Sequence, residues 1–145
     1  MNQPSRPVVV TWLLRIALAA SFLSAVADRL GLWGPPGTPN VVWGAWGPFV
    51  EYVGMLHPFA SATVYPWLGW SATILEVVIA LGLLIGWRLR TFAWASGGLL
   101  TLFGLVMTAS LGVKPPLDYS VWTAAAASFY LAMTVERRRE GNEPS

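Results

Sequence analysis

The sequence of 145 residues contains no cysteine and a single histidine, His57. Without cysteine, the chain cannot form disulfides or hold iron–sulfur clusters and thiolate metal sites. A lone histidine cannot supply both axial ligands of a bis-histidine haem within one chain. Because its natural co-ligands are missing, His57 is more typical of a solvated or capping residue than of a metal ligand. The sequence therefore excludes thiol redox chemistry and predicts no metal site.

Charged residues are also scarce, at 11% of the chain, whereas hydrophobic residues make up 55%. Ordinary soluble domains carry roughly 25% charged residues, so there are too few charges here to cover a water-exposed exterior. The net charge is only +2, and no basic face accompanies it apart from three arginines at the tail, which excludes nucleic-acid binding. The composition predicts one integral membrane domain over residues 1–145, with the lipid bilayer as its partner.

Four apolar stretches approach the roughly 20 residues that a helix needs to cross a bilayer. They are Val8–Ala27, Pro66–Trp87, Phe92–Leu111 and Tyr119–Val135. Because backbone groups find no water partner in lipid, each stretch is predicted to be helical. The predicted fold class is an all-α, four-helix membrane bundle. Ala25–Ala27 also fits a signal-peptide cleavage site, but Arg15 interrupts the preceding apolar run and favours a retained helix.

Positive residues are unevenly divided between the two ends of the predicted bundle. Two of them, Arg29 and Lys114, fall in the first and third connections. Six fall at the two termini and in the second connection: Arg6, Arg88, Arg90, Arg137, Arg138 and Arg139. Because cytoplasmic segments carry the excess of Lys and Arg, both termini are predicted to be cytoplasmic.

The first connection, Asp28–Tyr65, is long and rich in tryptophan and proline. Loops of this length are usually functional or partly structured. Within it, apolar residues recur at helical spacing, which predicts a short amphipathic helix at the outer interface: Trp46, Phe49, Val50, Val53 and Leu56. Its tryptophans fit an aromatic belt that anchors the protein, and a ligand-stacking platform is the alternative.

Arg15 and Glu76 lie inside the first and second predicted spans. Charged side chains in a bilayer core are costly and normally turn inward and pair. At 1.5 Å per residue, their Cα atoms differ in depth by only about 6 Å, so the sequence predicts an Arg15–Glu76 ion pair. Such a pair either fixes helix register alone, or it titrates, relays a proton or binds a polar head group.

Asp28, Lys114 and Asp118 form a second predicted polar site, at the outer membrane edge. Asp118 is placed to cap the fourth helix. Asp28 lies near a helix C-terminus, where its charge opposes the helix dipole, so Lys114 is its predicted partner. No Ser-His-Asp arrangement, phosphate loop or nucleotide fingerprint is present. Catalytic residues are therefore unassigned, and the ligand-binding candidates are Arg15, Glu76, Asp28, Lys114 and Asp118.

Small residues recur on one face of the third and fourth spans. They are Gly97, Thr101, Gly104 and Thr108 in the third, and Ser120, Ala124 and Ala127, in line with Leu131, in the fourth. Such stripes are typical of helix-packing seams rather than of pores.

From Trp12 to Ala132 the layout resembles the DoxX family of small four-helix bacterial membrane proteins. The resemblance rests on five segments and two arginines: Leu13–Arg15, Ala25–Arg29, Thr73–Glu76, Leu81–Gly86, Lys114–Val121, Arg88 and Arg90. Arg15 and Glu76 match the intramembrane Arg and Glu of that family. The long first connection and the absence of cysteine are departures from it.

The resemblance implies a multi-pass protein of the bacterial inner membrane. Some family members are similar to membrane subunits of quinone-linked oxidoreductases, and others accompany redox or stress-defence proteins. We therefore expect a membrane subunit that binds a quinone, lipid or small amphiphile, with a redox protein or a second copy as its partner. If it is an enzyme, it is a quinone-linked oxidoreductase. The alternative is a non-catalytic scaffold that recruits a partner through the outer Trp- and Pro-rich loop.

Overall fold

A computed structural model describes residues 6–140 of the chain, with side chains from residue 8 to residue 135. Arg6 and Arg137–Arg139, used above to predict orientation, have side chains outside that described range. The described chain is all-helical, as predicted. Its helices are α1 (Arg6–Arg29), α2 (Trp46–Leu56), α3 (Tyr65–Ile85), α4 (Leu89–Leu111), α5 (Lys114–Asp118) and α6 (Val121–Glu140).

Three of these helices, α1 from Val8 onward, α3 and α4, are long and apolar enough to cross a membrane. The apolar part of α6, Val121–Val135, is shorter. Large apolar side chains point outward on all three long helices, including Leu13, Ile74 and Leu105, each more than half exposed. A water-soluble monomer rarely exposes such continuous apolar surface, so the fold indicates a membrane protein.

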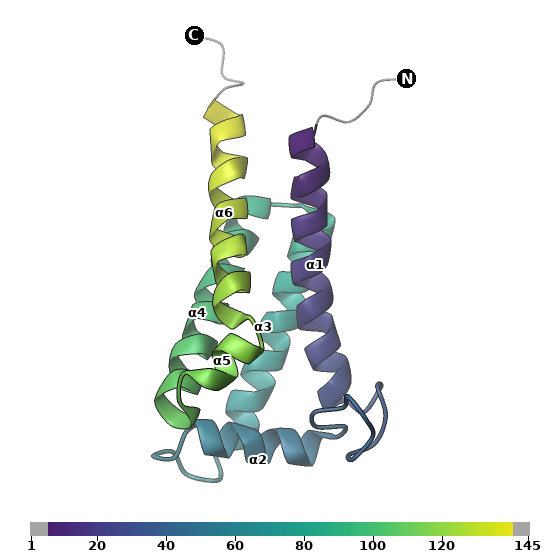
Figure 1. The fold of residues 1–145 in the computed structure, drawn as a ribbon, viewed down its shortest axis with the longest axis vertical. Helices are drawn as coiled ribbons and strands as arrows, with labels where there is room; N and C mark the ends of the chain where they lie inside the picture. The colour runs from purple at the N-terminus through teal and green to yellow at the C-terminus, as the bar shows by residue number, and fades with distance from the viewer. Residues whose placement is uncertain (1–5, 141–145) are drawn as a thin grey trace.

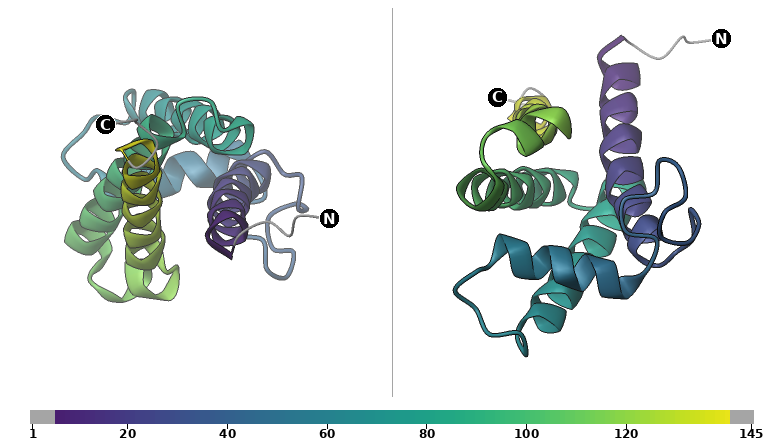
Figure 2. Two further views of the ribbon diagram at one scale, coloured as in Figure 1. Left: turned by 90° about the horizontal axis from the view of Figure 1, so that it is seen from above. Right: turned by 60° about the horizontal axis from the view of Figure 1, so that its bottom comes forward.

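The four long helices form a ring in which α1 and α4 do not touch each other. Helix α1 packs against α3 and α6, and α4 packs against the same two helices (Figures 1 and 2). Helix α2 lies across one end of this ring, against α3, α4 and α1 (Figure 1). The short amphipathic helix predicted in the first connection is thus confirmed, and its buried residues, Phe49 and Val53, belong to the predicted apolar stripe.

A tight turn joins α3 to α4 at the opposite end. Gly86 ends α3 with a φ of 80°, a backbone conformation that favours glycine. Helix α4 then begins at Leu89, three residues before the predicted start, and α3 ends two residues before the predicted Trp87. Gly82 lets the two helices approach closely, because a Cβ there would lie 2.3 Å from the Phe92 ring.

The seam between α4 and α6 is built from small residues, as predicted. A Cβ added at Gly97 would lie 2.4 Å from the Phe129 ring, and one at Gly104 would lie 2.9 Å from Trp122. Ser96 and Ser128 are fully buried in this seam and share a hydrogen bond of 2.8 Å. The two buried hydroxyls therefore satisfy each other, as burial requires.

The prediction that Asp118 caps the fourth helix is wrong. Asp118 is the last residue of an unpredicted short helix, α5, and its carboxylate accepts a hydrogen bond from Lys114 one turn earlier. Helix α6 begins only at Val121, after Ser120 adopts a positive φ of 54°. The chain turns between α5 and α6, so the first residue of α6 is three positions after Asp118, and the Asp118 carboxylate does not cap that helix.

Candidate functional site

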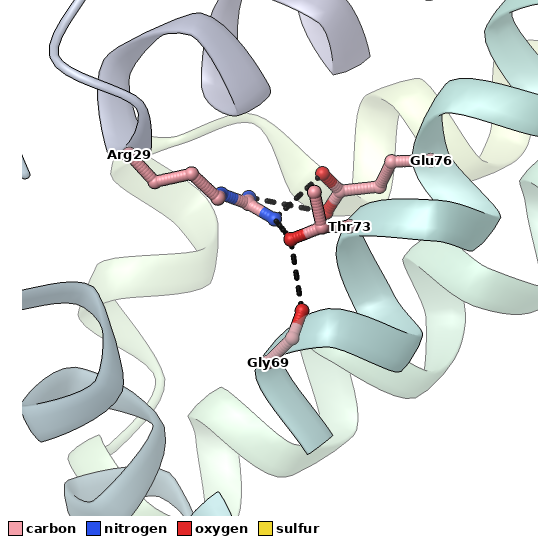
Figure 3. Close-up of polar contacts among 4 residues, drawn as sticks. All are labelled: Arg29, Gly69, Thr73 and Glu76. Carbon is pink, nitrogen blue, oxygen red and sulfur yellow. Dashed lines mark hydrogen bonds and ion pairs between the residues drawn. The ribbon is translucent and has the colours of Figure 1, made fainter. Parts of the chain in front are cut away.

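A buried ion pair between Arg29 and Glu76 joins α1 to α3 at the end of the ring covered by α2 (Figure 3). One terminal nitrogen of Arg29 lies 2.9 Å from a Glu76 oxygen, and the other donates a hydrogen bond of 3.3 Å to the second oxygen. Both residues are only 3% exposed. Charges buried this deeply are stable only when they are paired.

Further groups contact the Arg29 guanidinium, although its buried Nε has no hydrogen-bond partner among the described residues. Thr73 accepts a hydrogen bond of 2.9 Å from it and donates its own proton to the Gly69 carbonyl (Figure 3). The guanidinium carbon lies 4.1 Å from the centre of the Phe49 ring of α2 and 5.3 Å from that of Trp43. Such cation–π contacts gain strength where water is excluded. The first connection is therefore packed directly onto the charged centre.

The predicted pair between Arg15 and Glu76 is wrong. Arg15 is buried, but it donates hydrogen bonds of 2.7 and 2.8 Å to the carbonyl oxygens of Leu83 and Leu84. These are carbonyls of the last turn of α3, which lack partners within their own helix and attract a cation. Its guanidinium also lies 3.8 Å from the centre of the Trp12 ring. Arg15 thus holds the far end of α3.

Side-chain direction explains why Glu76 binds one arginine and not the other. Helices α1 and α3 are antiparallel, since Arg15 contacts Leu83 and Arg29 contacts Thr73. Side chains on a helix lean toward its N-terminus. Arg29 therefore extends back into the ring toward Glu76, whereas Arg15 extends away from Glu76 toward the end of α3. Depth along the membrane, used for the prediction, does not contain this information.

Asp28 does not bind Lys114, so that prediction is also wrong. Its carboxylate accepts backbone hydrogen bonds of 2.8 to 3.0 Å from Val42, Trp43 and Gly44. Lys114 lies at the surface and binds Asp118 instead. Three backbone amides of the first connection thus donate to the Asp28 carboxylate, which is satisfied without Lys114.

A cleft of about 460 Å³ opens beside Asp28. It lies between the last two turns of α1, the first connection and Tyr119, which precedes α6. Three aromatic residues line it: Trp33, Trp43 and Tyr119. Its volume falls in the range of small-molecule sites, which combine apolar walls with a few polar groups.

The polar lining of the cleft comes from hydroxyl and amide groups together with one acid. Ser21, Ser24 and Asn40 contribute the neutral polar groups, and Asp28 is the one charged residue among the described residues that line it. Trp33 is held against α1 by a hydrogen bond of 3.1 Å from its indole nitrogen to the Ser24 carbonyl. The wall nearest α1 is therefore fixed in place.

Trp43 connects the cleft to the aromatic packing under α2. Its ring centre lies 5.1 Å from that of Phe49 and 5.7 Å from that of Tyr52. Burial raises the pKa of the Tyr52 phenol above its ordinary value, and nearby Tyr119 adds to the shift. Tyr52 therefore stays neutral, and the inner wall beside Trp43 is an uncharged aromatic cluster.

Four of the five predicted site residues lie at the end of the molecule covered by α2: Asp28 and Glu76, and Lys114 and Asp118 in α5 (Figure 1). Arg15 lies at the opposite end of α1's contact with α3, and Lys114 and Asp118 form an exposed surface pair. Arg29 is not among the predicted site residues, although its position in the last turn of a helix and the lean of side chains toward the N-terminus favour its contact with Glu76. His57 has the expected capping role, because it ends α2 and its Nδ1 lies 2.9 Å from the Val53 carbonyl.

Compared with known proteins, the chain matches no family model, no curated protein and no solved structure.

Proposed function

We propose that the chain is a DoxX-like, multi-pass protein of the bacterial inner membrane, with α6 as its fourth span. The start of α1, the α3–α4 turn and the end of α6 lie at one end of the molecule, opposite α2 (Figure 1). Arg88 and Arg90 belong to that end. The positive-inside rule supports a cytoplasmic location for it. The cleft and α2 then face the outer side of the membrane.

The proposed activity is binding of a quinone, lipid or small amphiphile in the cleft beside Asp28, as the non-catalytic membrane subunit of a redox-linked complex. The cleft itself is the observation that carries this proposal. It lies where the apolar helices meet the outer connection, so an occupant can place its head group among Trp33, Trp43 and Tyr119 while its chain follows α1 into the lipid. Amphipathic aromatic residues suit this depth.

Lipid analysis of purified protein tests the proposal. Protein extracted into native nanodiscs is expected to carry one quinone or amphiphile above its level in the surrounding membrane. Ala25 lines the cleft, so Ala25→Trp fills it and should abolish the enrichment. Ala126→Trp, which adds the same bulk at an exposed site on α6, is the matched control and should retain it. Wild-type protein with no enriched molecule would overturn the proposal.

A partner-recruiting scaffold is the second candidate, and the exposure of the first connection favours it. Leu32, Trp33 and Phe59 are 75%, 60% and 102% exposed. Trp43 and Trp46 are partly buried and pack on Phe49, so they support the fold in addition to any contact with a partner.

The scaffold hypothesis predicts that Phe59→Ser leaves the protein folded but lowers the mass of its complex in native membranes. Trp43→Ala is expected instead to lower stability. An unchanged complex mass with Phe59→Ser and Leu32→Ser together would exclude recruitment through this loop.

A further inference from the structure

The buried charges at the outer end do not balance. Arg29 is the one cation among the described residues buried there, and its guanidinium is engaged by Glu76. The Asp28 carboxylate accepts hydrogen bonds from three backbone amides, and the adjacent Arg29, which is shared with Glu76, is the one cation that attracts it among the described residues. Amide dipoles stabilise a carboxylate without cancelling its charge. This end of the protein thus carries a net negative charge at the wall of the cleft.

The partial charge of the α1 C-terminus has the same sign. Helix α1 ends at Arg29, and its last turns form one wall of the cleft. A helix C-terminus is equivalent to a fractional negative charge and favours cations nearby. No Lys or Arg is among the described residues that line the cleft. An anionic head group would therefore meet repulsion with no positive partner.

The aromatic residues that line the cleft also favour a cationic ligand. Trp33, Trp43 and Tyr119 all line a single cleft. The negative faces of aromatic rings attract cations, and cages of such rings recognise quaternary ammonium groups. Trp43 already interacts in this way with Arg29, from 5.3 Å.

We propose that the cleft binds the cationic head group of a lipophilic amine, an alkylammonium or choline-type quaternary ammonium, against Trp33, Trp43 and Tyr119 with Asp28 as counter-charge. The inference rests on the proposed amphiphile-binding function and names the head-group class. The apolar chain of the ligand follows α1 past Ser21 toward the membrane. The quaternary ammonium has two sources, a free lipophilic cation or the head group of a choline lipid.

Binding of decyltrimethylammonium to the full-length protein in nanodiscs tests this inference. Nanodiscs of a neutral galactolipid contain no competing amine, and empty nanodiscs correct for partitioning. The matched ligand is the uncharged isostere in which carbon replaces the nitrogen. We expect at least tenfold tighter binding of the charged probe. Adding phosphatidylcholine to the nanodiscs separates the two sources, because a choline lipid in the cleft displaces the probe and a free-cation site retains it.

Two variants and a control locate the binding. Tyr119→Leu removes a ring that is 61% exposed and should weaken probe binding by about 2- to 30-fold, the range of a cation–π contact. Asp28→Asn removes the counter-charge and should weaken it further, and Tyr119→Leu remains informative if Asp28→Asn does not fold. Trp67→Leu, at a 75% exposed tryptophan outside the cleft, should leave binding unchanged.

Equal affinity for the probe and its uncharged isostere would overturn the proposal that the cleft recognises a cationic head group. If the isostere or a quinone still binds and Ala25→Trp blocks that binding, the proposed amphiphile-binding function is retained and only the preference for a cation is rejected. If neither the probe, the isostere nor a quinone binds above empty nanodiscs, the proposed function falls together with the inference.

Discussion

Arg29 and Glu76 illustrate how much at the level of single residues depends on side-chain direction. The sequence identifies Glu76 as a buried charge that needs a partner, and the structure confirms that it is buried and paired. Which arginine of α1 pairs with Glu76, Arg15 or Arg29, depends on the direction in which helical side chains lean. That direction selects Arg29 because α1 and α3 are antiparallel. Residue type and depth alone therefore predicted a pair but assigned the wrong cation.

A double-mutant cycle measures this pairing directly. Arg29→Leu leaves Glu76 buried without a cation and should lower the free energy of unfolding by about 3–5 kcal/mol. The double variant Arg29→Leu/Glu76→Leu should lose less unfolding free energy than the two single variants together, by about 1–3 kcal/mol. Equilibrium unfolding in mixed detergent micelles provides the measurement.

The same cycle with Arg15 is the control. Arg15→Leu removes two hydrogen bonds to α3 carbonyls and is destabilising, but it should add to Glu76→Leu within about 0.5 kcal/mol, because the two side chains share no contact. A larger coupling of Glu76 with Arg15 than with Arg29 would contradict the observed pairing.

At the level of elements, the spacing of residues along the chain predicted the helices and their packing better than it predicted the structure of the connections between them. Helix α2 follows from the spacing of its apolar residues, and the packing of α4 on α6 follows from Gly97 and Gly104. Helix α5 was missed because Pro115 and Pro116 read as a loop, although proline is tolerated in a first helical turn. The anchoring of the first connection on Asp28 was missed because the donors are backbone amides, which no sequence pattern marks.

Asp28→Asn tests how the first connection is held. An amide side chain has one acceptor oxygen in place of two, so it cannot satisfy all three amides of Val42, Trp43 and Gly44. We expect hydrogen exchange at residues 42–44 to accelerate by at least tenfold. Asp118→Asn breaks only an exposed ion pair, worth at most about 1 kcal/mol, and should leave these amides unchanged. Equal exchange in wild type and Asp28→Asn would refute this anchoring role.

Adjacent glycines of α4 provide a matched test of the seam with α6. A methyl group at Gly97 would overlap the Phe129 ring, whereas one at Gly98 meets nothing within 4 Å. Gly97→Ala should therefore lower the free energy of unfolding by about 1–3 kcal/mol through overpacking. Gly98→Ala should raise it by up to about 1 kcal/mol, because alanine is the better helix former. Thermal unfolding of both variants in one detergent gives the comparison, and equal effects would argue against close packing at this seam.

At the scale of the whole molecule, composition predicts a membrane protein, because too few charges remain to cover a water-exposed surface, and the length of the apolar stretches predicts that it is helical. The described helices bear this out with three apolar helices of membrane-spanning length. The fourth span and the orientation rest on the shorter apolar part of α6 and on the distribution of arginines. The outward-facing cleft, and hence the ligand proposed for it, depends on that topology.

Cysteine labelling measures this topology most directly, since the chain contains no cysteine of its own. Phe59→Cys and Trp87→Cys place single thiols at residues that are 102% and 66% exposed, at opposite ends of the molecule. In intact spheroplasts, a membrane-impermeant maleimide should label Phe59→Cys at once and Trp87→Cys only after the membrane is permeabilised. Labelling of both thiols from the same side, or of Trp87→Cys alone from outside, would contradict a bilayer-spanning protein with an outward-facing cleft.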